Sequence, residues 1–230
     1  MLRAMGLAAA ALTMIAGPAL AASLPESDPL APQSIAQSML VNARHYSAPR
    51  PDVLGTVAVD AGVTLYDARF RRVAAADRND PRVAGLAAGL TGLSPYEMIA
   101  GVRSAVAGRV RYASDFDTIG VSDYWSSAGE TLARGAGDDA DIAIVEMQVL
   151  KAAGYNPQDL MLSVGRYARR GTHVVLLART PQGFFMLDQA EDRLVPAARA
   201  DGRFTPVMTI APGHSWIHGY RVGQRQMAGR

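Results

Sequence analysis

The chain has 230 residues and a formal net charge of +2, with both signs interspersed, which predicts neither a nucleic-acid surface nor a polybasic membrane patch. It contains no cysteine, which excludes disulfides, thiolate metal sites and thiol catalysis. The length suits one domain with a substantial core and is short for two.

The first residues have the pattern of a secretory signal peptide. Arg3 supplies a positive charge, residues 7–15 form a short apolar run, and Ala19 and Ala21 give the small-x-small pattern that signal peptidase reads. The apolar run is shorter than the ~20 residues that a membrane-spanning helix needs. We therefore predict a signal peptide over residues 1–21, a periplasmic or secreted mature protein, and no later membrane span.

The next segments carry weaker signals. Residues 22–52 are rich in proline and serine, which predicts a poorly ordered lead-in before a domain over residues 53–230. Residues 53–75 mix β-branched residues with Gly55 and Gly62, a composition that favours short strands or an extended wrap.

A sharp helix signal begins at Ser94. Ser94 suits the N-cap, Pro95 the first helical position, and Glu97 the third, so the start has the form of a capping box. We expect this helix to end near Gly108.

A second, more apolar helix is predicted from the aspartates that follow Gly137. Asp138 and Asp141 suit the positive end of a helix dipole. The run from Ile142 to Leu150 is interrupted by only two polar residues, Glu146 and Gln148, so this helix should be central. Gly154 suits its C-terminal cap.

The sequence then changes to the period of strands joined by short polar turns, which favours an antiparallel sheet. The predicted strands are residues 160–164, 172–178, 183–188, 193–196, and two more near 206–210 and 215–221. A helix followed by such a meander predicts an α+β fold.

These segments carry a family resemblance. The stretch DYWSSAGETLARGAGDDADIA (residues 123–143) resembles the pattern D-Y-W-x-x-x-x-E-T-L-x-x-G-x-G-D-C-E-D-Y-A of the bacterial transglutaminase-like cysteine proteinases. THVVLLA and FFMLDQ resemble that family's H-x-V-L and L-D-N strands. The resemblance spans about residues 102–216 and implies a papain-like or transglutaminase-like α+β fold, with a central helix packed on an antiparallel sheet.

The resemblance also implies the site. The family's chemistry needs a Cys at the start of the central helix, a strand His as base and a carboxylate that orients it. His173 takes the base position and Asp188 the orienting position, whereas Asp139 stands where the nucleophile belongs. Ala140 and Ile142 replace the family's Glu and Tyr. The predicted catalytic triad is therefore degenerate.

A carboxylate is poorly suited to replace the cysteine. Its attack on an amide would form an anhydride, which is more reactive than the amide, so the covalent intermediate would lie uphill. An aspartic-protease-like use would instead need Asp188 or Asp141 to share a proton with Asp139. The resemblance places His173 between Asp139 and Asp188.

The helix-start carboxylates have a second interpretation. Asp138 and Asp141 are first expected to cap the helix. The alternative is that they ligate calcium, which some members of the resembled family bind beside the cysteine; the loss of an acidic residue at Ala140 disfavours it. No other cofactor is predicted.

Three functions follow from the sequence. The first is an exported, catalytically inactive homologue whose retained cleft binds a peptide or an envelope protein. The second is a hydrolase or peptidase that uses Asp139 or a metal ion. The third is a structural module of the cell envelope.

Overall fold

The computed structural model describes residues 48–75, 77, 79–167, 171–198 and 202–221. The predicted signal peptide and residues 22–47 of the predicted lead-in lie outside the described residues. Residues 48–52 carry no helix or strand, and Ala48 is buried. Within the described ranges, no helix is both long and apolar enough to cross a membrane.

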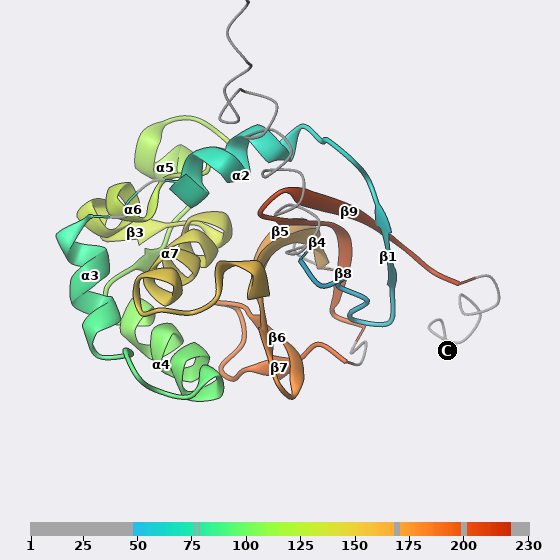
Figure 1. The fold of residues 1–230 in the computed structure, drawn as a ribbon. Helices are drawn as coiled ribbons and strands as arrows, with labels where there is room; N and C mark the ends of the chain where they lie inside the picture. The colour runs from blue at the N-terminus through green and yellow to red at the C-terminus, as the bar shows by residue number, and fades with distance from the viewer. Residues whose placement is uncertain (1–47, 76, 78, 168–170, 199–201, 222–230) are drawn as a thin grey trace, which may run out of the picture. The chain divides into compact units, whose positions relative to one another are not determined.

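Helices dominate the first half of the described chain and strands the second (Figure 1). The helices are α2 (Tyr66–Ala75), α3 (Pro81–Ala88), α4 (Pro95–Ala107), α5 (Asp115–Ile119), α6 (Ala128–Arg134) and α7 (Asp139–Ala152), with a 3-10 turn η1 (Pro157–Asp159). The strands are β1 (Val57–Asp60), β2 (Arg111–Tyr112), β3 (Ala136–Gly137), β4 (Leu160–Tyr167), β5 (Gly171–Thr180), β6 (Gly183–Leu187), β7 (Val195–Pro196), β8 (Phe204–Ala211) and β9 (His214–Gly219).

Seven strands form an antiparallel sheet in the order β1-β9-β8-β4-β5-β6-β7, and β2 pairs with β3 in a separate parallel pair. Successive side chains of a strand point to opposite faces. In β5, Val174 and Leu176 accordingly join the core that contains the helices, whereas Val175 and Leu177 join a second core with Trp216. The predicted α+β class is confirmed.

The helix α7 is the centre of the larger core. It contacts α3, α4 and α6 as well as β4 and β5 (Figure 1). Ile144, Val149 and Leu150 have no exposed surface. A helix that is apolar around most of its circumference needs packing on every side. The prediction of a central helix packed on an antiparallel sheet is therefore confirmed.

The start of α4 agrees with its capping signal. The Ser94 hydroxyl accepts a hydrogen bond from the Glu97 backbone N–H, and the Glu97 carboxylate accepts one from the Ser94 N–H at 2.9 Å. The helix ends at Ala107, with Gly108 as its C-cap. This prediction is also confirmed.

The prediction of short strands or an extended wrap over residues 53–75 is wrong for the second half of that segment. Strand β1 pairs with β9, as a strand prediction would allow, but residues 66–75 form the helix α2. Phe70 and Val73, three residues apart, bury one face of this helix, and Asp67 stands in its first turn. The i, i+3 spacing outweighs the local β propensity because it puts both apolar side chains in the core.

Candidate active site and acidic cluster

Three side chains from different elements meet at the N-terminus of α7. Asp139 is the first residue of α7, His173 lies in β5, and Asp188 directly follows β6. The His173 Nδ1 atom lies 3.3 Å from Asp139 Oδ2, and its Nε2 atom lies 2.9 Å from Asp188 Oδ1. The structure thus brings together the three residues that the sequence predicted for the triad position, with the imidazole between the two carboxylates.

Asp188 is fully enclosed and strongly hydrogen-bonded. Besides His173, its carboxylate accepts hydrogen bonds from the Tyr167 hydroxyl and, at 2.8 Å, from the Ala190 backbone N–H. Burial alone would raise the pKa of Asp188, but these hydrogen bonds outweigh it and hold the pKa below its ordinary value. Asp188 is therefore an anion that orients His173.

Sequence reasoning missed the aromatic wall of this site. The Tyr167 ring meets the His173 ring edge to face, with centroids 5.0 Å apart, and Phe204 lies on the same side. Gly165 is the partner of His173 across β4 and β5, and a Cβ there would lie 2.4 Å from the Phe204 ring. The close packing of β4 and β8 beside His173 therefore requires glycine. No local motif marks these residues, because they meet only through strand pairing.

Asp139 joins α7 to the sheet. Its Oδ2 atom accepts a hydrogen bond from the Val174 backbone N–H, and its side chain is 14% exposed. Burial raises the pKa of Asp139 above its ordinary value, although the His173 charge and the Val174 N–H oppose the shift. His173 stands between Asp139 and Asp188, so each carboxylate contacts the imidazole. The two carboxylates are therefore not placed to share a proton directly with each other.

An acidic cluster lies beside the triad. Asp115, Asp138 and Asp141 each offer a carboxylate oxygen, and these three oxygens lie within 4.8 Å of one another. Asp138 caps α7 by accepting from the Asp141 N–H at 3.0 Å, as predicted. Asp115, in α5, was not foreseen, because it lies outside the helix-start motif and reaches the cluster only through the fold.

Each member of the cluster has a distinct environment. Burial, reinforced by neighbouring aspartates, raises the pKa of Asp138 to about 7. Burial also raises the pKa of Asp141 to about 6, although its carboxylate accepts hydrogen bonds from the Ser126 N–H and the Arg134 guanidinium, both at 2.8 Å. Asp115 is 3% exposed, and its Oδ1 atom has no hydrogen-bond partner among the described residues.

The donor set of this cluster fits a hard cation. Calcium takes oxygen ligands, mostly carboxylates, and tolerates irregular geometry. Three converging carboxylates supply such ligands, and the Oδ1 atom of Asp115 is a buried acceptor that none of the described residues satisfies.

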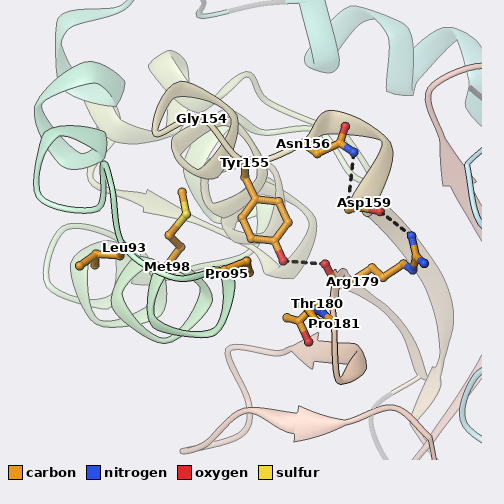
Figure 2. A pocket seen from close by; sticks show the side chains of 10 residues that line it. All are labelled: Leu93, Pro95, Met98, Gly154, Tyr155, Asn156, Asp159, Arg179, Thr180 and Pro181. Atoms are coloured by element: carbon orange, nitrogen blue, oxygen red, sulfur yellow. Dashed lines mark hydrogen bonds and ion pairs between the residues drawn. The ribbon is translucent and has the colours of Figure 1, made fainter.

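A separate cavity of about 450 Å³ lies at the other end of α7, between Met98, Tyr155 and Pro181 (Figure 2). Its polar groups are paired with one another: the Tyr155 hydroxyl donates to the Arg179 carbonyl at 2.8 Å, and Asp159 pairs with the Arg179 guanidinium at 3.2 Å. With 14 residues in α7, this cavity lies about 20 Å from the triad.

Comparisons with known proteins identify the fold and the family. Residues 88–219 match the profile of the family described as bacterial transglutaminase-like cysteine proteinase. The calcium-bound structure of LapG from Legionella pneumophila is 24% identical with a TM-score of 0.51, covering 65% of this chain and 86% of that one. The EGTA-treated LapG structure is 23% identical with a TM-score of 0.53, covering 70% and 91%.

These structural likenesses show the fold. A comparison with curated protein sequences found no match. The family profile, in contrast, covers more than half of the chain and includes Asp139, His173 and Asp188. On that match, the chain belongs to the bacterial transglutaminase-like cysteine proteinase family.

Proposed function

We propose that this protein is a catalytically inactive member of its family that binds a peptide or an envelope protein. The observation that carries the proposal is Asp139, which lies 3.3 Å from His173 at the start of α7, where the family resemblance places the nucleophilic cysteine. The chain has no cysteine anywhere, and the first turn of α7 (Asp139, Ala140, Asp141, Ile142) has no hydroxyl. An acyl-enzyme has no suitable atom on which to form.

The geometry also disfavours the rival enzyme mechanisms. A shared proton needs two carboxylates in direct contact, but the His173 ring separates Asp139 from Asp188. Asp141 is held by Ser126 and Arg134. The carboxylate at position 139 serves instead to connect α7 with β5 and to hold the imidazole.

A surface hollow beside the triad supports binding. An outer groove of about 590 Å³ runs between α4 and residues 189–194, lined by Tyr96, Arg103, Gln189 and Leu194 among others. Gln189, which lines this outer groove, directly follows Asp188, although the three triad side chains are not among the lining residues. Its mixture of aromatic, aliphatic and charged side chains suits an extended peptide.

The proposed location is the periplasm or the extracellular space. It rests on the charged, apolar and small-residue pattern of residues 1–21. An envelope protein exposed to that compartment is the partner that such a location favours.

The purified mature chain is expected to bind members of an immobilised peptide library and to cleave none of them. Removal of the nucleophile from a comparable triad costs on the order of 10⁶ in turnover, so no residual peptidase or transglutaminase reaction should be measurable. Mass spectrometry of the library measures cleavage, and fluorescence polarisation of its members measures binding.

The matched control for that experiment is Asp139→Ala. Turnover that survives exhaustive purification and is lost in Asp139→Ala would contradict the inactive assignment. An absence of binding by the wild type to both the peptides and a cell-envelope extract would favour a structural module instead.

The same proposal includes calcium as a structural ligand of the acidic cluster. LapG, which shares the fold, has been solved in a calcium-bound form. Here Asp115, Asp138 and Asp141 would hold the ion and tie α5 to the start of α7. The ion would add positive charge to a cluster in which Arg134 already pairs with Asp141, and would add no reaction step.

Calcium is expected to raise the melting temperature of the EDTA-treated protein. At a concentration about 100 times the dissociation constant, an ion that binds only the folded state adds about 2.7 kcal/mol, or roughly 5–10 °C for a domain of this size. Differential scanning fluorimetry measures the shift. Asp115→Asn should abolish most of it, whereas Asp117→Asn, an exposed change in the same helix, should leave it intact. An equal rise in both variants would place the ion elsewhere.

A further inference from the structure

A second, smaller cavity adjoins the outer groove. This inner pocket, of about 140 Å³, lies between α4, α7 and the segment after β6. The two cavities share Arg103 and Gln189 as lining residues, so they adjoin. The walls of the inner pocket combine apolar side chains, among them Val106, Val110 and Ile142, with polar ones, among them Arg103, Glu146 and Gln189.

The inner pocket is lined by residues that are close in sequence to the degenerate triad. Ile142 stands one turn after Asp139 in α7, and Gln189 follows Asp188. The Arg103 guanidinium donates to the Asp188 carbonyl at 3.2 Å and also to the Glu191 carbonyl. The inner pocket is therefore connected to the triad through neighbouring residues, whereas the three triad side chains are not among its lining residues.

Glu146 is the feature of the inner pocket that the fold does not explain. Its side chain lines the cavity, and the residue is 3% exposed. The described part of the chain gives Glu146 no hydrogen bond or ion pair, and its carboxyl oxygens are not among the fully enclosed side-chain atoms that lack a partner, so they face the cavity. A carboxyl of a buried residue needs a hydrogen-bond partner. Here that partner is whatever occupies the cavity.

The protonation of Glu146 follows from its surroundings. Burial raises its pKa to about 8; the Arg103 charge on α4 opposes this rise, and the Asp188 charge adds to it. Tyr112, on β2, is the other titratable side chain that lines the pocket. At neutral pH Glu146 is therefore mainly a neutral carboxylic acid, with one O–H donor and one carbonyl acceptor.

We propose that the inner pocket binds the carboxamide side chain of a glutamine or asparagine in a peptide that lies in the outer groove, with Glu146 as its hydrogen-bond partner. The assignment rests on the proposed peptide-binding function. A carboxamide offers a carbonyl acceptor and N–H donors, which complement the acceptor and donor of the neutral acid. A lysine side chain would meet Arg103 at the entrance, and a carboxylate would meet Asp188 nearby. The apolar walls suit the methylene groups of glutamine.

The test uses the N-acetyl methylamides of glutamine, lysine, glutamate and leucine as probes on the full mature chain. Binding is measured from NMR chemical shifts of the Gln189 and Arg103 side chains. The glutamine probe is expected to bind about tenfold more tightly than the other three, because leucine leaves the carboxyl unpaired, the lysine charge meets Arg103 and the glutamate charge meets Asp188. Its affinity should fall as the pH rises through about 8, where Glu146 ionises.

Two variants sharpen the test. Glu146→Gln keeps a donor and an acceptor but does not titrate, so it should bind the glutamine probe with an affinity independent of pH between 6 and 9. Glu146→Leu should remove the preference for glutamine. If Glu146→Leu does not fold, the comparison of wild type with Glu146→Gln across the pH range still decides the proposal.

Several outcomes would overturn the assignment. Tighter binding of the lysine probe, growing stronger as the pH rises, would make the pocket a cation site. Unchanged glutamine binding in Glu146→Leu would place the probe elsewhere. If library peptides bind the outer groove with no preference for glutamine, this inference fails while the peptide-binding function stands. If the glutamine probe binds and no peptide does, the proposed peptide-binding function is wrong, whereas the carboxamide assignment of the inner pocket remains.

Discussion

Asp139→Cys is expected to react with iodoacetamide near pH 6 about tenfold faster than a free cysteine. Residue 139 begins α7, so its side chain lies at the positive end of the helix dipole. The His173 Nδ1 atom lies 3.3 Å from the present carboxylate. Both features favour thiolate over thiol, and the larger thiolate fraction outweighs the lower nucleophilicity of a more acidic thiol.

The labelling is specific because the wild-type chain has no cysteine. A second change, His173→Ala, should slow the reaction of the Asp139→Cys variant. The matched control is Ser104→Cys, an exposed position on α4, which should react like a free thiol. If the Asp139→Cys variant folds and reacts no faster than this control, residue 139 and His173 do not form a unit, and the proposed degenerate triad is wrong. Peptidase activity is not expected to return, because Ala140 and Ile142 also differ from the family pattern.

Arg134→Met is expected to lower the free energy of unfolding by about 3 kcal/mol. The Arg134 guanidinium donates to the Asp141 carboxylate at 2.8 Å, to the Ser126 hydroxyl at 2.9 Å and to the Ala136 carbonyl at 3.1 Å. The Asp141 side chain has no exposed surface. Loss of the arginine leaves a carboxylate enclosed without its cation at the start of α7.

Urea denaturation measures the loss, which corresponds to a fall in melting temperature of roughly 6–12 °C for a domain of this size. The matched control is Arg69→Met, which breaks an ion pair with Asp123 whose side chains are 42% and 65% exposed. An exposed pair contributes at most about 1 kcal/mol. Equal losses of unfolding free energy in the two variants would show that the hydrogen-bond network around Asp141 contributes no more to stability than an exposed ion pair.

The sequence by itself determined the elements that local patterns specify. The capping box at Ser94 predicted the start of α4, and the apolar run after Asp141 predicted the buried helix α7. Alternating apolar residues predicted the strands of the antiparallel sheet. Caps and periodicities act within one element, so a single sequence carries them. The order and spacing of the family motif also singled out His173 and Asp188 and predicted Asp139 at the position that the resemblance gives to the cysteine.

The tertiary structure alone decided which distant residues meet. Asp115 joins Asp138 and Asp141 because α5 packs beside the start of α7, and Tyr167 reaches Asp188 because β4 and β5 pair in one register. Glu146 looked in the sequence like an interruption of an apolar run, whereas the fold places it in the wall of a pocket between α4 and α7. Contacts between elements far apart in the chain determine whether a carboxyl group is buried and whether it has a hydrogen-bond partner. Those contacts, and not local propensity, therefore determine its pKa.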